Sequence, residues 1–144
     1  MFINYPKRVV CLTEETTETL YLLGAQDLIV GISGFTVRPP QARKEKPKVS
    51  AFTSAKIPKI LALEPDLVLG FSDLQADIAA ELVRHGIETH VFNHRTVGEI
   101  LRMIATLGGM LGLQAAAEEL AVSLNDRVES IRQKQIGKVR PKVY

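Results

Sequence analysis

The sequence lacks tryptophan and has a single cysteine, Cys11, among its 144 residues. A lone cysteine cannot close a disulfide within the chain, and its place in the apolar run 8–12 favours a buried structural thiol. No stretch reaches the ~18 continuous apolar residues of a membrane-spanning helix. Residues 1–7 also lack the charged region, apolar run and cleavage site of a secretory signal, although a signal already removed would leave the same start. The compartment therefore stays open.

Sequence motifs of nucleotide binding and of metal catalysis are missing as well. No Gly-x-Gly-x-x-Gly follows an apolar run, and no Gly-x-x-x-x-Gly-Lys-Ser/Thr occurs. The paired glycines Gly108 and Gly109 lie in a helical pattern, where they favour close packing. Of the histidines His85, His90 and His94, only His94 is expected in a loop, and a metal or catalytic site needs several converging groups. We therefore expect no metal, no resident cofactor and no catalytic residue.

The composition is that of an ordinary globular domain, with 46% hydrophobic and 24% charged residues. The net charge of +2 is uneven, because basic residues and no acid follow Glu129. Those basic residues are Arg132, Lys134, Lys138, Arg140 and Lys142. A basic tail can touch nucleic acid, but this one contains one aromatic residue, Tyr144, and no nucleic-acid recognition motif. We expect a solvated surface and no nucleic-acid partner.

Short apolar, β-branched runs alternate with helical patterns along the chain. They occupy residues 8–12, 28–32, 48–50, 67–70 and 89–92. Such alternation is typical of βα units around a largely parallel sheet. The sequence therefore predicts the α/β class, as a three-layer lobe whose central sheet is mostly parallel.

Capping and stop residues mark the boundaries of the helices. The first helix is expected after Thr13, whose hydroxyl is predicted to cap it, and to end at Gly24. A short helix is expected over residues 56–63, before Pro65. Two further helices, reaching about residues 85 and 111, are predicted from pairs with capping-box spacing. These pairs are Ser72 with Gln75 and Thr96 with Glu99.

A long helix is predicted from residue 113 to about 135, because apolar residues recur there every three or four positions. The stripe consists of Leu113, Ala117, Leu120, Leu124, Val128 and Ile131. At about 1.5 Å per residue this helix is roughly 30 Å long. Beyond Gly137, residues 139–144 are expected to form the first strand of a further sheet, with a frayed tail as the alternative.

Loops at the carboxyl ends of the strands are where ligands bind in open α/β sheets. The corresponding segments are 13–15, 33–38, 51–54, 71–73 and 93–95, and they contain Phe35, Phe52 and Phe71 out of 5 phenylalanines. Apolar rings on loop tips either cover a ligand or fold back onto the core. Both alternatives stay open for Phe52 and Phe71, and Phe35 is the weaker ligand candidate.

Several segments together resemble one family. They are Arg8-Val9-Val10-Cys11-Leu12-Thr13, Val30-Gly31-Ile32-Ser33, Pro39-Pro40, Lys48-Val49-Ser50 and Ile60-Leu61-Ala62-Leu63-Glu64-Pro65-Asp66-Leu67-Val68-Leu69. The chain resembles the amino-terminal lobe of the cobalamin and iron-siderophore substrate-binding proteins. The resemblance implies two α/β lobes joined by one long helix, a ligand held between them, delivery to an ABC importer in the membrane, and no catalysis. It thus implies a ligand-binding lobe over 1–112, an interlobe helix over 113–136, and the start of a second lobe over 137–144.

The resemblance also implies the residues of the site. In the cobalamin-binding branch, aromatic side chains pack on the ligand, and the matching positions are Phe35, Phe52 and Phe71. That branch often has tryptophan or tyrosine there, so the ligand stays either a cobalamin-like compound or a ferric siderophore. Polar contacts to such a metal chelate are expected from further residues at this edge: Thr13, Arg38, Asn93 and Arg95.

Family members present acidic residues to arginines of the membrane permease, and the matching residues are Asp73 and Asp77. The alternative is that these acids favour the positive end of a helix dipole. The resemblance implies an extracytoplasmic location, but the missing signal leaves a cytoplasmic relative open.

Two other functions remain open. One is a doubly wound α/β enzyme or nucleotide-binding domain, for which a glycine fingerprint should follow the first strand; Thr13-Glu14-Glu15 stands there instead. The other is a helical interaction module, in which the stripe from Leu113 to Ile131 packs on another chain. An exposed stripe would make the isolated chain a possible dimer.

Overall fold

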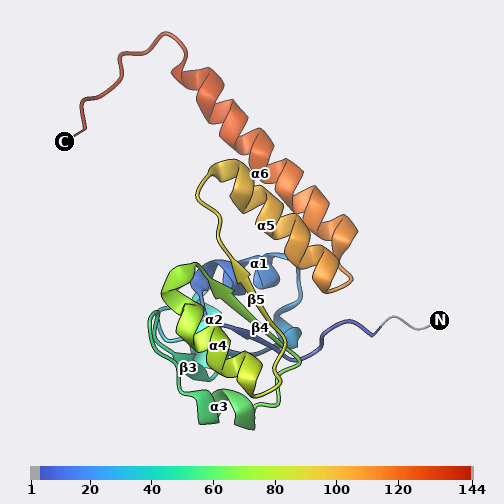
Figure 1. The fold of residues 1–144 in the computed structure, drawn as a ribbon. Coiled ribbons are helices and arrows are strands. Elements are labelled where there is room, and N and C mark those ends of the chain that lie inside the picture. The colour runs from blue at the N-terminus through green and yellow to red at the C-terminus, as the bar shows by residue number, and fades with distance from the viewer. Residues whose placement is uncertain (1–3, 144) are drawn as a thin grey trace.

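The computed structural model of the chain describes residues 4–143. A 5-stranded sheet forms its centre, with the strand order β3-β2-β1-β4-β5, and every pair of neighbouring strands is parallel. The strands are β1 (Val9–Cys11), β2 (Ile29–Ser33), β3 (Lys48–Ser50), β4 (Leu67–Phe71) and β5 (Thr89–Phe92). Each apolar run of the sequence forms one of them, which confirms the α/β class and the parallel sheet (Figure 1).

Helices connect the strands and follow the last one. They are α1 (Glu14–Leu22), α2 (Pro40–Glu45), α3 (Ile57–Ala62), α4 (Ala76–Arg84), α5 (Val97–Met110) and α6 (Gln114–Gln135), with short 3-10 turns at Gln26–Leu28 and Asp73–Gln75. The sequence did not predict α2. It is 6 residues long, starts with a proline in its first turn and buries only Ala42, so it has no periodic apolar stripe.

The two faces of the sheet bury separate cores, because successive strand side chains point to opposite sides. Val10 and Val68 pack on one face with Leu82 of α4. Val9 and Leu69 pack on the other face, together with residues of α1 and α5. The three layers expected from the sequence are therefore present, and α6 adds an outer helix against α5 (Figure 1).

Helices α5 and α6 pack against each other along the length of α5. Gly108 of α5 lies directly against Ala117 of α6, and a Cβ atom added to Gly108 would lie 2.1 Å from the Ala117 Cβ. A Cβ at Gly109 would meet nothing within 4 Å. The close packing expected from the paired glycines is therefore confirmed for Gly108, whereas Gly109 faces open space.

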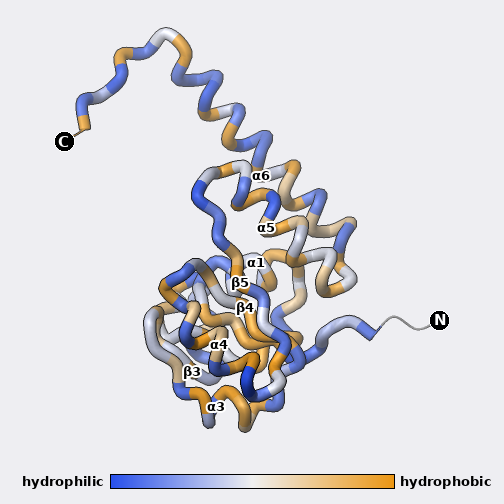
Figure 2. Tube along the Cα trace, viewed as in Figure 1, coloured by the Kyte–Doolittle hydropathy of each residue, from blue (hydrophilic) through white to orange (hydrophobic). Residues whose placement is uncertain are grey.

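The far end of α6 lies outside this contact. Val128 is half-buried, but Ile131 is 60% exposed, because α5 is 14 residues long and α6 is 22. The last turns of α6 and the segment after them extend away from the sheet, and apolar and polar positions alternate along this segment (Figures 1 and 2). Residues 139–143 are irregular rather than the expected strand, since no neighbouring strand in the described chain offers them hydrogen bonds. Tyr144 lies outside the described residues.

The helix caps predicted at Thr13 and at Thr96 have different outcomes. Thr13 precedes α1, but its hydroxyl donates to Glu15 Oε1 at 2.8 Å instead of capping the helix. Thr96 and Glu99 form the expected capping box on α5, and hydrogen bonds from Arg95 and Thr96 to the Glu99 carboxylate lower its pKa. None of the helices between residues 4 and 143 combines the length and the apolarity that crossing a bilayer requires.

Candidate functional site

The carboxyl ends of β1 and β4 form the switch point of the sheet, because the strand order runs outward from them in both directions. Doubly wound sheets bind their ligands in the crevice at such a point. Here the side chain of Gln75, which is 1% exposed, occupies that position. Its Nε2 donates to the carbonyl oxygens of Leu12 (3.2 Å) and Phe52 (2.8 Å), and its Oε1 accepts from the Phe71 amide (2.9 Å).

Gln75 is the residue at this edge that sequence reasoning missed. Its spacing from Ser72 predicted a capping box, and Ser72 Oγ does accept from the Leu74 amide at 3.3 Å. The Gln75 side chain instead turns into the sheet, and Ser72 takes a positive φ of 60° at the turn. No signal in the sequence separates these two uses of a glutamine, because its partners come from distant parts of the chain.

Phe71 lies at the centre of a small cluster at the ends of β4 and β5. It is the last residue of β4 rather than a loop residue, and it is half-buried. The His94 ring packs on it with centroids 4.7 Å apart, and the Arg95 Cζ lies 5.2 Å from its centroid. Arg95 Nη2 also lies 3.6 Å from Asp73 Oδ1. The cluster thus combines an apolar ring, a cation and an imidazole, whose Nδ1 is buried without a partner in the described chain.

The remaining site candidates lie in different environments. Phe52 is half-buried and tied through its carbonyl to Gln75, whereas Phe35 is 65% exposed. Asn93 is exposed beside the Phe71 cluster. Thr13 is only 3% exposed, so its hydroxyl is engaged within the fold.

Arg38 lies on the other side of the switch point, above the start of α1. Its guanidinium lies 3.7 Å from Glu14 Oε1 and 3.3 Å from Glu18 Oε2. Its backbone amide donates to Glu14 at 3.0 Å. The Arg38 side chain is 69% exposed, so it reaches solvent while its charge is already compensated.

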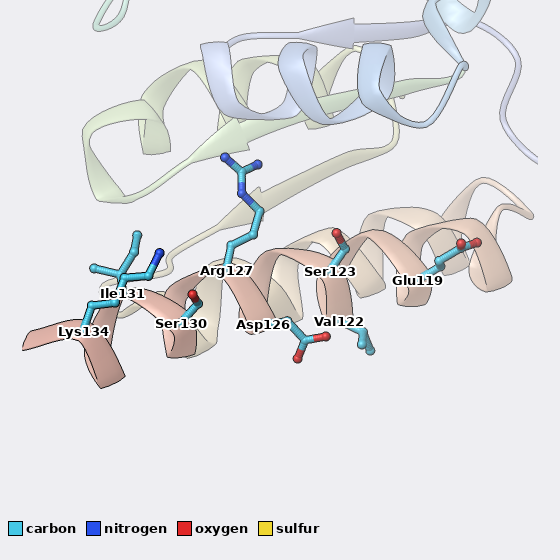
Figure 3. Close-up of a pocket in the computed structure, with 8 residues that line it drawn as sticks. All are labelled: Glu119, Val122, Ser123, Asp126, Arg127, Ser130, Ile131 and Lys134. Carbon is cyan, nitrogen blue, oxygen red and sulfur yellow. The ribbon is translucent and has the colours of Figure 1, made fainter.

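The surface is hollowed beside the strand ends and also elsewhere. One of about 290 Å³ runs along β5 and the first turns of α5, with Asn93, His94 and Glu99 in its wall. Another, of about 630 Å³, lies along α6. Figure 3 shows its lining side chains diverging, with Arg127 pointing toward the sheet and Val122 and Asp126 pointing the other way. A ligand pocket needs converging walls, so we place the candidate site at the strand ends.

A metal ion has no evident place within the described part of the chain. Between residues 4 and 143, no three histidine, cysteine, aspartate or glutamate side chains lie close enough to hold one. Cys11 is buried at 0% exposure, and burial raises the pKa of its thiol to about 12. It is therefore a structural thiol, as expected from its apolar surroundings.

A sequence model of a family described as "Periplasmic binding protein" matches residues 9–143. The chain belongs to this family. The resemblance drawn from the sequence is therefore confirmed. Within this binding-protein family, the chain is 29% identical over 143 residues to the "Cobalamin-binding protein" of Halobacterium salinarum, covering 96% of this chain and 39% of that protein. It is 27% identical over 135 residues to the "Vitamin B12-binding protein" of Vibrio campbellii, covering 92% and 49%.

Solved structures of other binding proteins share the fold. The periplasmic vitamin B12 binding protein BtuF of Vibrio cholerae superposes with a TM-score of 0.81 at 23% identity, covering 92% of this chain and 52% of that one. The siderophore binding protein BauB superposes with a TM-score of 0.85 at 20% identity, covering 98% and 51%. The chain thus spans 39–52% of the length of these four proteins.

The side chain of Gln75 bears on the alternative of a doubly wound enzyme. A doubly wound α/β enzyme, the alternative function left open by the sequence, would place its ligand in the crevice between β1 and β4. In this binding protein the Gln75 amide fills that crevice and uses its hydrogen bonds on the backbone. The space between these strand ends is therefore already occupied by a side chain of the described chain, and Phe52 and Phe71 lie at the same edge.

Proposed function

We propose that the chain is the amino-terminal lobe and connecting helix of the substrate-binding component of an ABC importer. Its ligand is a cobalamin-like compound or a ferric siderophore, held between two lobes and not chemically changed. Relatives named cobalamin-binding and vitamin B12-binding protein support this ligand class, and one relative of Bacillus subtilis is named an ABC transporter substrate-binding lipoprotein. The lobe corresponds to residues 1–112, the helix to 113–136 and the beginning of the second lobe to 137–144.

The observation that carries the proposal is the pair of half-buried rings at the strand ends, Phe52 and Phe71, with Arg95 over Phe71. A corrin ring or a siderophore presents an apolar face together with polar or anionic edges. Each Å² of apolar surface that the rings bury against such a face contributes about 25 cal/mol. Two rings with a neighbouring cation match that combination of surfaces.

The cations at the edge differ in how easily they can turn to a ligand. Among residues 4–143, Arg95 has one acidic partner, Asp73, whose side chain is 84% exposed, whereas Arg38 pairs with both Glu14 and Glu18. Exposed ion pairs contribute about 0–1 kcal/mol, so releasing Arg95 costs little. We therefore assign the anionic or polar edge of the ligand first to Arg95 and Asn93, and then to Arg38. Phe35 is the third ring available to the ligand. Thr13, which is buried at the start of α1, is assigned to the same edge.

Docking to the permease is assigned to Asp73 and Asp77, which are both exposed near the start of α4. The periplasmic family and the lipoprotein relative support an extracytoplasmic location for this step. Asp77→Lys leaves the Asp73–Arg95 contact in place. We expect it to reduce the ligand-stimulated ATPase activity of the reconstituted importer without changing ligand affinity, whereas unchanged stimulation would remove Asp77 from the docking surface.

Isothermal titration tests the ligand class. The complete product of the reading frame is titrated with cyanocobalamin, ferric enterobactin and hemin. We expect cyanocobalamin or ferric enterobactin to bind, and Phe71→Ala to weaken that binding at least tenfold, while Val83→Ala on the exposed side of α4 leaves it unchanged. Absence of binding by both cyanocobalamin and ferric enterobactin would refute the proposed ligand class, and binding of hemin alone would place the ligand outside it.

A further inference from the structure

The amide of Gln75 joins three strand ends that lie far apart in the sequence. It contacts the carbonyl of Leu12 from 63 residues away and that of Phe52 from 23 residues away, and it accepts from Phe71 four positions before it. With Nε2 donating twice and Oε1 accepting, both amide hydrogens and one acceptor are used. At 1% exposure, water cannot replace these bonds.

Two of the joined residues are the half-buried rings of the proposed ligand edge. Phe71 is fixed within β4, but Phe52 lies in the turn 51–54, whose backbone support within the described part of the chain is local. That support is a hydrogen bond from the Ala51 amide to the Ser54 carbonyl and the bridge between Ser50 and Ala55. The bond from Gln75 is therefore a long-range tie that sets the turn of Phe52 relative to Phe71.

Gly70 makes room for this amide. A Cβ added to Gly70 would lie 3.0 Å from the Gln75 Oε1, which is tighter than ordinary contact. The absence of a side chain at this buried strand position thus lets Gln75 reach all three backbone groups. The arrangement depends on two residues, one that supplies the amide and one that leaves space for it.

We propose that Gln75 is a positioning residue for the ligand: its amide fixes the spacing of the Phe52 and Phe71 rings before the ligand arrives. A preorganised edge does not lose loop entropy on binding, and this raises affinity without any contact between Gln75 and the ligand. The inference rests on the proposed ligand site at this edge.

Three variants of the complete reading-frame product test it. Gln75→Met keeps the length of the side chain and removes all three hydrogen bonds. Gly70→Ala keeps the amide but presses a methyl group against its oxygen. Leu82→Ala, in α4, which directly follows Gln75, is the control: Leu82 is at 0% exposure, so the variant destabilises the fold without touching the edge.

Two measurements separate positioning from stability. The first, without ligand, is the hydrogen exchange of the Phe71 amide relative to that of Leu69 in the same strand. The second is the affinity for whichever of cyanocobalamin, ferric enterobactin and hemin binds the wild-type protein. We expect Gln75→Met to accelerate the relative exchange and to weaken binding at least tenfold, Gly70→Ala to do both to a smaller extent, and Leu82→Ala to do neither while it remains folded.

The outcomes distinguish this inference from the proposed function. Faster relative exchange with unchanged affinity would make Gln75 a purely structural residue and overturn the inference. An equal loss of affinity in Leu82→Ala would do the same. If the wild-type protein binds none of the three compounds, the proposed ligand class fails, and unchanged relative exchange in Gln75→Met would overturn the tie between the loops as well.

Discussion

Adding one methyl group to either member of the glycine pair in α5 should change stability in opposite directions. Gly109→Ala introduces a Cβ with nothing within 4 Å, and alanine is favoured over glycine within a helix by roughly 0.5–1 kcal/mol. We therefore expect this variant to be more stable than the wild-type protein. Gly108→Ala receives the same gain in helix propensity, so the difference between the two variants isolates the steric contribution.

That steric contribution is large at Gly108. The new methyl carbon would lie 2.1 Å from the Ala117 Cβ and 3.1 Å from the Leu113 carbonyl oxygen, whereas carbon atoms in contact prefer about 3.5–4.0 Å. Helix α6 must then retreat from α5 and loosen the packing around Leu107. Overpacking of this kind costs about 1–3 kcal/mol, which is the difference in the free energy of unfolding that we expect between Gly108→Ala and Gly109→Ala.

Urea denaturation followed by circular dichroism measures this difference, since the chain has no tryptophan to report by fluorescence. The denaturation midpoint should fall for Gly108→Ala and rise slightly for Gly109→Ala, with similar slopes. Removing the opposing methyl in the double variant Gly108→Ala/Ala117→Gly should relieve the clash, seen as a favourable coupling energy between the two sites. Equal midpoints for the two single variants would refute the packing argument.

Three further outcomes are expected. Burial and the hydrogen bond to Glu45 raise the pKa of Tyr21 to about 12. The protonated Tyr21 therefore stabilises the folded protein fully below about pH 10, the pKa of tyrosine in the unfolded chain. This contribution to the free energy of unfolding is lost as the pH rises toward 12. The stability difference between wild type and Tyr21→Phe should shrink over that interval, and a constant difference would contradict the assignment. Cys11, with its pKa raised to about 12 by burial, should resist Ellman's reagent at pH 8 until the chain is unfolded; rapid labelling of the native protein would contradict its burial. Light scattering should show self-association of the 144-residue chain that Ile131→Glu abolishes, and a monomer at every concentration would exclude the exposed stripe as a dimer surface.

The strands were predictable because their residues suit a sheet buried on both faces. Val9 and Val10 point to opposite cores and are both fully buried, so β1 has no polar position that could suggest an amphipathic helix. The order of the strands does not follow from such local patterns. It is this order, with Phe71 paired to Phe92 across β4 and β5, that brings Arg95 over the Phe71 ring.

The side-chain hydrogen bonds were less predictable than the elements. Glu99 returns to its own helix start, as the capping-box spacing predicts, because every partner is within four residues. Gln75 has the same spacing, yet its partners are brought to it by the sheet. The alternating pattern of residues 139–143 illustrates the same limit, since a strand requires a neighbour that a local pattern cannot supply.

The contact between Gly108 and Ala117 also fixes the direction of the α6 axis and therefore the position of its far end. Ala117 lies in the first turn of α6, and Gln135, the last residue of the helix, follows 18 positions later, which is about 27 Å along a rigid rod. A tilt of about 5° at the contact therefore moves the free end by roughly 2 Å. Because the Gly108 backbone packs directly on the small Ala117 side chain, little freedom remains for such a tilt. The orientation of the residues that follow Gln135 therefore depends on the absence of a side chain at Gly108.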